Sequence, residues 1–162
     1  MVRLRELCAE LGCEDVTTYI ASGNVVLTSE LDADKLARAL ETAIEREFGF
    51  DVAVVVLTAA ELAVVVEKNP FPDAEPAALQ VAFAATPIAS ADVERLQKVD
   101  LPPEELVVRG RQLYLHMPNG HVRRLPAAID RIVGKQITVR NWRTVETLTA
   151  MAGRRLDKQS AP

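Results

Sequence analysis

The 162-residue sequence contains few cysteines and histidines, and this scarcity excludes several kinds of site. Its two cysteines, Cys8 and Cys13, cannot build a disulfide framework, and neither a second cysteine pair nor a histidine pair accompanies them at zinc-site spacing. The sequence also lacks a glycine-rich phosphate loop, a Walker motif and a dinucleotide fingerprint. We therefore expect no metal site and no cofactor.

Long hydrophobic runs are missing as well. No apolar stretch approaches the roughly 20 residues that a membrane-spanning helix needs. The first six residues, MVRLRE, are charged where a secretory signal would be apolar. With 49% hydrophobic residues, 26% charged residues and a net charge of −4, the composition is that of an ordinary globular domain. The expected location is the cytoplasm, with no membrane partner.

The charges are segregated along the chain. Residues 107–162 hold eleven Lys/Arg and three Asp/Glu, a net +8, whereas residues 1–106 carry −12. A basic segment of this kind favours a surface for phosphate, nucleic acid or another polyanion. Alternatively, the acidic and basic segments face each other within the fold or across a dimer. Beyond residue 107 the aromatic residues are Tyr114 and Trp142, both at core positions, so the stacking platform of a single-strand nucleic-acid binder is missing.

The hydrophobic pattern of the first half predicts helices and strands in a definite order. Apolar residues at helical spacing predict a helix that ends at Gly12, and a second helix is expected between Asp32 and Gly49. Two β-prone runs flank a short turn at residues 21–24, and the continuous apolar run at 52–57 predicts a buried strand. A capping box at Thr58 and Glu61 begins a further helix that runs to about residue 67.

The second half repeats this order with one strand more. Its pattern is strand, helix, strand, strand, helix, strand, followed by a C-terminal helix that begins near Asn141. We therefore predict an α+β fold of two ferredoxin-like (βαββαβ) halves with antiparallel sheets, the first lacking its initial strand. The expected divisions are a first half with its connecting helix at 1–68, a linker at 69–78, a second half with the C-terminal helix at 79–153, and a frayed tail at 154–162. An incomplete first sheet exposes an unpaired edge, which favours self-association.

Three phrases carry a resemblance to a known family. They are TYIASGNVV at residues 18–26, NPF at 69–71 and TVRNWRTV at 138–145, together with Leu148. In this order they resemble the bacterial family catalogued as domain of unknown function 1697. The resemblance implies ferredoxin-like halves and no established activity. Similar members begin with an additional apolar strand and a glycine loop of the form LRGINVGG, which this sequence lacks.

The first candidate binding motif is Ser22-Gly23-Asn24, between the two predicted strands. Glycine supplies a positive φ angle there and asparagine hydrogen-bonds the local backbone, so one interpretation is turn chemistry alone. In the other, the Ser hydroxyl, the Asn amide and the Gly N–H converge as neutral donors that hold an anion. The surroundings do not match a nucleophile motif, and His116 and His121 offer no argued catalytic triad or metal site.

The second candidate motif contains Arg140, Asn141 and Arg143 at the start of the last helix. Asn141 is a natural N-cap, and a helix N-terminus flanked by arginines attracts anions. In the structural interpretation, Asn141 only caps, Trp142 packs in the core, and Arg140 pairs with an acidic residue of the first half. Both interpretations can hold together.

Three functional hypotheses follow from these motifs. The first is a non-catalytic module that binds a small anion or polyanion, either phosphate or nucleic acid, through Ser22, Gly23, Asn24, Arg140, Asn141 and Arg143. The second is an enzyme that acts on a small anionic substrate in the same cleft, with no catalytic residue identified. The third is a structural, self-associating domain whose motif residues maintain the fold.

Overall fold

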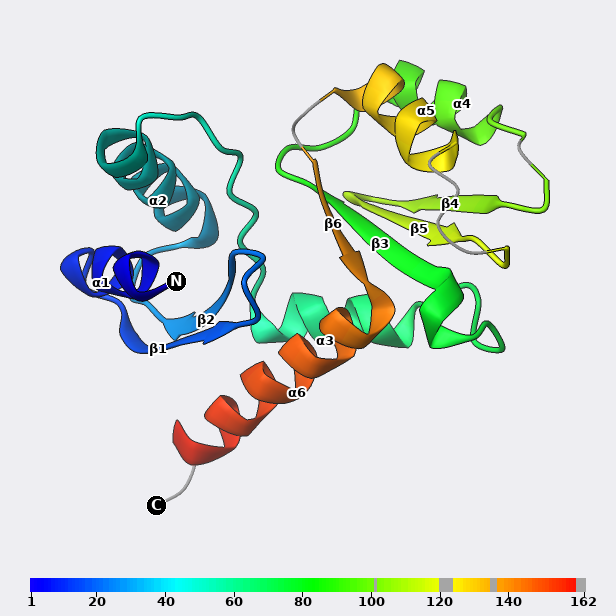
Figure 1. The fold of residues 1–162 in the computed structure, drawn as a ribbon. Coiled ribbons are helices and arrows are strands. Elements are labelled where there is room, and N and C mark those ends of the chain that lie inside the picture. Colours follow the sequence, from blue (N-terminus) through cyan, green and yellow to red (C-terminus); the bar gives the residue numbers. More distant parts are fainter. Residues whose placement is uncertain (101, 120–123, 135–136, 160–162) are drawn as a thin grey trace.

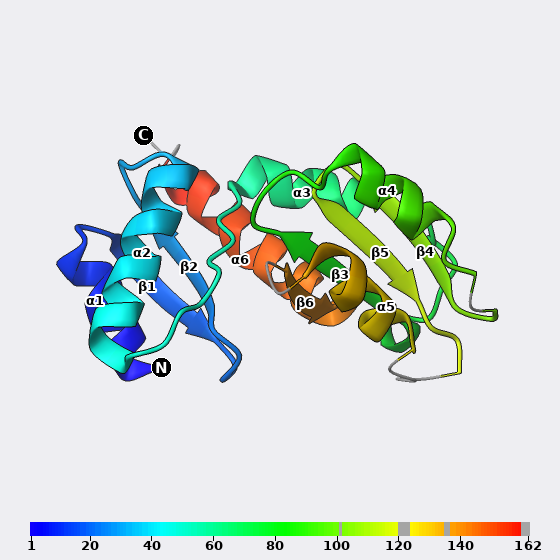
Figure 2. The same ribbon diagram turned by 90° about the horizontal axis from the view of Figure 1, so that it is seen from above.

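A computed structural model describes residues 1–100, 102–119, 124–134 and 137–159. The chain forms an α+β fold with two antiparallel sheets, as the sequence predicts, one of two strands and one of four. Figures 1 and 2 place the smaller sheet and its helices beside the larger one. Within the described residues, no helix is both long enough and apolar enough to span a bilayer.

The first half consists of two helices packed on a β-hairpin. Its elements are α1 (Val2–Glu10), β1 (Glu14–Tyr19), β2 (Asn24–Thr28) and α2 (Ala33–Phe48). Asp32 accepts a hydrogen bond from the Lys35 N–H at 2.8 Å, and Gly49 ends α2 with a left-handed φ of 74°, so both predicted ends of this helix are confirmed. The core here contains Cys8, Cys13, Leu36 and Leu40, all buried.

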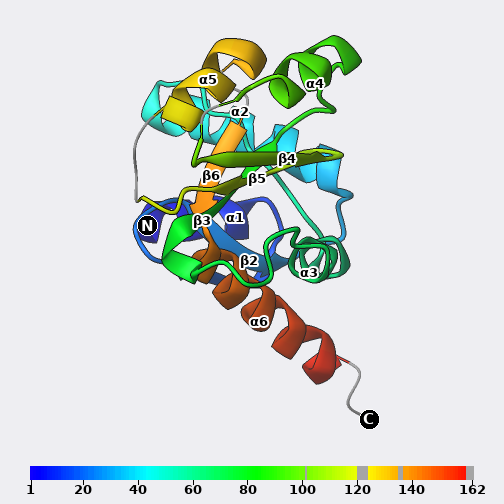
Figure 3. The ribbon, with the colours of Figure 1, turned by 90° about the vertical axis from the view of Figure 1, so that its right-hand side faces the viewer.

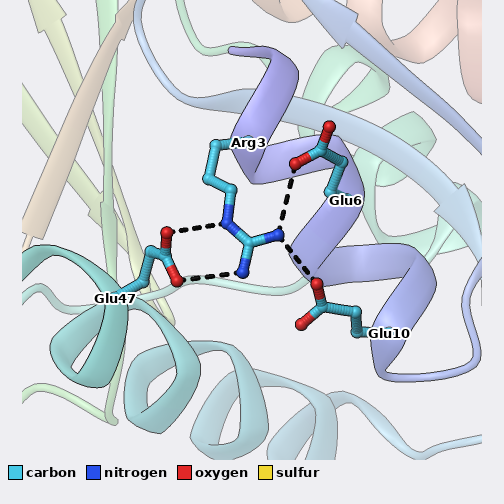
Figure 4. A network of polar contacts seen from close by, with 4 residues as sticks. All are labelled: Arg3, Glu6, Glu10 and Glu47. Carbon is cyan, nitrogen blue, oxygen red and sulfur yellow. Dashed lines mark hydrogen bonds and ion pairs between the residues drawn. The ribbon is translucent and has the colours of Figure 1, made fainter.

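A four-residue ion network ties α1 to α2 (Figure 4). The Nε and Nη2 atoms of Arg3 donate to the two carboxylate oxygens of Glu47, at 2.7 and 2.9 Å. Its Nη1 atom donates to Glu6 and Glu10 on its own helix, at 3.2 and 2.7 Å. The two-pronged contact fixes the start of α1 beside the end of α2.

The prediction of a strand at residues 52–57 is wrong. This segment forms no strand pairing, and no backbone-to-backbone hydrogen bond involves it within the described part of the chain. Its side chains alternate all the same: Val54 and Val56 pack on the first core, and Val55 and Leu57 on a core of the second half. Neither described strand of the first half, β1 or β2, pairs with this segment. Residues 52–57 therefore have the composition of a strand, but no described strand lies beside them to form backbone hydrogen bonds.

A short helix connects the halves. α3 (Ala59–Glu67) begins with the predicted capping box, in which Thr58 Oγ1 accepts from the Glu61 N–H at 3.1 Å and Glu61 Oε2 accepts from the Thr58 N–H at 2.8 Å. After α3, Asn69 and Phe71 exchange two hydrogen bonds that turn the chain. The short 3-10 helix η1 (Pro76–Ala78) then leads into the second half.

The second half is a complete βαββαβ unit. Its elements are β3 (Leu79–Ala84), α4 (Ser90–Gln97), β4 (Glu105–Arg109), β5 (Gln112–His116), α5 (Arg124–Val133) and β6 (Ile137–Asn141). The strands lie in the order β4-β5-β3-β6, with β3 central. Such an order is ferredoxin-like.

Helices cover both faces of this sheet. α4 and α5 pack on one side through Leu96 and Ile129, while α3 and α6 (Trp142–Gln159) pack on the other through Val65, Trp142 and Val145 (Figure 3). β3 is consequently buried along almost its whole length. α6 extends to Gln159, and Arg155 of α6 donates to Thr17 of β1 at 2.8 Å.

Candidate functional site

The Ser22-Gly23-Asn24 motif forms the turn between β1 and β2. Gly23 has a φ of +75°, which L side chains rarely adopt, so glycine is required there. Asn24 is 6% exposed, and its Nδ2 atom donates to the Tyr19 carbonyl at 3.2 Å and to Ser22 Oγ at 2.9 Å. These two hydrogen bonds favour the turn-chemistry interpretation of Asn24, because its amide nitrogen is engaged within the turn itself.

Arg140 of β6 brings the two candidate motifs together. Its Nη2 atom donates to the Ser22 carbonyl at 2.9 Å, and its Nε atom donates to Asn24 Oδ1. On its own strand, the Nη1 atom donates to Thr138 Oγ1 and to the Val139 carbonyl, the latter at 2.8 Å. A single guanidinium thus joins the turn of the first half to the edge strand of the second.

The four oxygens that accept hydrogen bonds from Arg140 among the described residues are all neutral. The structural interpretation placed an acidic residue of the first half beside it, but no carboxylate of the described residues forms an ion pair with this side chain. Burial lowers the pKa of Arg140 because the charged form loses solvation. The guanidinium nevertheless stays protonated, as arginine does in proteins. The junction therefore holds a half-buried positive charge with no described counter-charge.

The residues that follow Arg140 start the last helix. Asn141 Oδ1 accepts from the Thr144 N–H at 2.8 Å, so the predicted N-cap is confirmed. Trp142 is 6% exposed and packs in the core, as expected. Arg143 is exposed on the first turn of α6, with no described contact to the Ser22–Asn24 turn. The structure thus joins Ser22 and Asn24, with Gly23 between them, to Arg140, and leaves Arg143 at the surface.

Two residues of this junction were not singled out as site residues from the sequence. Thr138 accepts from Arg140, and Arg155 reaches Thr17 from the far end of α6. Thr138 lies two residues before Arg140 and therefore on the same face of β6, so strand periodicity could have found it. Nothing in the sequence marks the contact of Arg155, because it depends on where α6 crosses the first sheet.

Two other reactive side chains, those of His116 and Cys8, are engaged in contacts or buried. His116 Nδ1 lies 3.0 Å from Glu105 Oε1, and the ring of His116 packs against Phe71. His121 lies outside the described residues. Cys8 is fully buried, and burial raises the pKa of its thiol to about 11. Among the described residues, no group of three or more His, Cys, Asp or Glu side chains is arranged to hold a metal ion.

The chain is thus an α+β protein with a two-stranded and a four-stranded antiparallel sheet, and Arg140 joins its two halves. The chain belongs to the family described as protein of unknown function DUF1697, whose model matches residues 1–114. It is similar in fold to a conserved bacterial protein from Streptococcus pneumoniae, with a TM-score of 0.73 and 22% sequence identity. That similarity covers 94% of this chain and 88% of the other. No curated protein matches the sequence.

Proposed function

We propose that this protein is a non-catalytic module that binds a small anion at the junction of its two halves. Arg140 supplies the central charge, and Arg143 a second charge on the first turn of α6. The Ser22-Gly23-Asn24 turn adds the Ser22 hydroxyl and the Gly23 N–H as donors, while Asn24 and Asn141 hold the turn and the start of α6 in place. A small anion fits better than nucleic acid, because the net charge of −4 repels a polyanion at long range.

One observation carries this proposal: all four described hydrogen bonds of Arg140 go to neutral oxygens. A half-buried charge is costly unless an opposite charge compensates it, so an anion that reaches the guanidinium gains more there than at a paired arginine. Four of the five N–H donors of Arg140 are occupied, which leaves one directed donor, while the charge itself attracts at longer range. The start of α6 adds its partial positive charge.

Calorimetric titration with inorganic phosphate at low salt tests the proposal. We expect wild-type protein to bind phosphate with an affinity that falls as salt rises, since salt screens the attraction. Arg143→Ala should weaken binding about fivefold or more, by loss of one charge-assisted contact. Arg131→Ala removes the same charge from an exposed position on α5 and is the matched control. Equal affinities for wild type and Arg143→Ala would contradict the assignment of Arg143, and no binding by wild type would contradict the function.

A second candidate function, a structural self-associating domain, is supported by the incomplete first sheet. β2 pairs with β1 alone among the described strands, and residues 52–57 pair with none. Exposed apolar side chains accompany this gap, with Phe50 56% and Val52 39% exposed. Unpaired strand edges beside apolar surface favour pairing with a second copy.

Light scattering across a range of protein concentrations tests self-association. We expect a mass of about twice 17.7 kDa at high concentration. The substitution Val52→Lys places a charge beside the unpaired edge and should return the protein to a monomer. The matched control Val64→Lys, at an exposed valine on α3, should leave the dimer unchanged. A monomer at every concentration would rule out the second function and leave anion binding untouched.

A further inference from the structure

A shallow groove lies on the second half, away from the junction. It has a volume of about 590 Å³, within the range of small-molecule sites. One wall is α3, and the other is the hairpin between β4 and β5. Since β5 and β3 lie between β4 and β6 in the sheet, the groove is separate from Arg140 on β6. None of the residues that the sequence analysis proposed as ligands lines it.

Three cations line this groove: Lys68 at the end of α3, and Arg109 and Arg111 on the hairpin. None of the three forms an ion pair with a carboxylate of the described residues, whereas Arg3 and Arg95 elsewhere on the surface do. Positive charges gathered in a concave surface concentrate the electrostatic potential there. The groove therefore attracts anions more strongly than a flat surface with the same charges.

The carboxylate in the groove wall is turned toward the helix start. Glu61 Oε2 accepts from the Thr58 N–H at 2.8 Å and from the Thr58 hydroxyl at 3.0 Å, as part of the capping box. Its negative charge is thereby held at the N-terminus of α3, where it is stabilised by the helix dipole. The three cations at the groove are thus opposed by one carboxylate that already has a structural role.

The hairpin geometry explains why the arginines stand at the groove. Arg109 pairs with Gln112, so Gly110 and Arg111 form a two-residue turn, and Gly110 adopts a φ of +61°. Arg111 Nη1 donates to the Ala85 carbonyl at 3.3 Å, which anchors this side chain and leaves its other N–H groups to donate elsewhere. The positive charge of Arg109 acts on the buried Tyr114 hydroxyl, where it opposes the rise in pKa that burial causes.

The floor of the groove is apolar. Val64 is 42% exposed there, while Val65 and Tyr114 are buried beneath it. The Tyr114 hydroxyl donates to the Val65 carbonyl at 2.9 Å, so it presents no free polar group to the groove. An apolar floor below a cationic rim matches a ligand with an anionic head and a small apolar body.

We propose that the groove between α3 and the β4–β5 hairpin binds a phosphomonoester, with Arg109, Arg111 and Lys68 on the phosphate and Val64 under the organic group. A phosphate dianion suits three cations better than a carboxylate does, and arginine matches phosphate oxygens with two parallel donors. The site is independent of the anion proposed at Arg140.

Calorimetric titration with phenyl phosphate tests this inference. We expect the double variant Arg109→Gln, Arg111→Gln to bind about tenfold more weakly than wild type, because two charge-assisted contacts are lost. Lys68→Gln, at an exposed helix end, should weaken binding less, and Arg131→Ala on α5 should leave it unchanged. Far-UV circular dichroism and thermal unfolding establish that each variant is folded. Unchanged affinity in the folded double variant would overturn the proposal.

Two further binding experiments distinguish the groove from the junction. In a ¹⁵N NMR titration with phenyl phosphate, Arg143→Ala should show the same saturable shift changes at residues 109–112 as wild type, while its shift changes at residues 22–24 and 138–144 with inorganic phosphate should be smaller. Inorganic phosphate should bind the groove more weakly than phenyl phosphate, since it lacks the apolar group that covers Val64. Equal binding of both probes at the groove would contradict the role given to the apolar floor.

Discussion

Among single residues, Arg140 has a structural role that can be measured apart from any ligand. Its guanidinium joins Ser22 and Asn24 to Thr138 and Val139, so removal leaves several oxygens without a donor. We expect Arg140→Ala to lower the free energy of unfolding by about 2 kcal/mol, from the loss of hydrogen bonds to a charged group. Arg140→Lys should recover only part of this, because an ammonium cannot reproduce the planar fork.

Urea unfolding of both variants provides the measurement, with Arg143→Ala as the control. Arg143 is exposed and has no described side-chain partner, so its loss should change stability by no more than about 0.5 kcal/mol. Equal stabilities of the Arg140 and Arg143 variants would show that Arg140 does not hold the halves together.

Cys8 gives a second prediction at the residue scale. Burial, and then the neighbouring Cys13, raise its pKa to about 11, above the ordinary value of about 9. The native thiol therefore stays protonated where the unfolded thiol ionises, and stability should fall as pH rises from about 9 toward 11. At pH 8, an aromatic disulfide reagent should react with Cys8 only as fast as the protein unfolds, and at once in guanidinium chloride. Rapid reaction of the native thiol would contradict its burial.

Among the elements, α3 begins with the clearest local signal in the sequence. Thr58→Ala removes the side-chain acceptor of the capping box and should destabilise the protein by about 1 kcal/mol. Glu61→Gln keeps an acceptor oxygen in place and should cost less. Chemical denaturation of the two variants measures the difference, and an equal or larger loss for Glu61→Gln would contradict this account of the helix start.

Local signals such as this one were predictable because they depend on neighbours in the sequence. Asp32 and Gly49 at the ends of α2, the capping box of α3 and the Asn141 cap of α6 all lie within a few residues of the groups that they bind. Residues 52–57 have strand composition but no strand beside them, and strand formation depends on that distant partner.

The contacts of the candidate site likewise depend on residues that are distant in the sequence. The sequence identified both motifs, but the partners of Arg140 in the first half lie 116 and 118 residues away. Their neutral chemistry could not be deduced from composition, since the strong negative charge of the first half favoured an acidic partner. The contact of α6 with β2 places the start of α6 and the end of β6 beside the first sheet (Figure 2).

For the whole molecule, we expect energetic coupling between the halves. A double-mutant cycle with Asn24→Ala and Arg140→Ala should give an interaction free energy of about 1 kcal/mol, because the two side chains share a hydrogen bond across the junction. Lys35→Ala on the exposed surface of α2 should combine additively with Arg140→Ala. An additive Asn24–Arg140 cycle would mean that the halves are joined by other contacts.

The most direct test of anion binding at the junction is a two-dimensional ¹⁵N NMR titration of the whole chain with inorganic phosphate at low salt. We expect saturable shift changes at residues 22–24 and 138–144, with smaller changes in Arg143→Ala and unchanged ones in Arg131→Ala. Shifts that do not saturate, or that leave residues 22–24 and 138–144 unaffected, would contradict the proposed site.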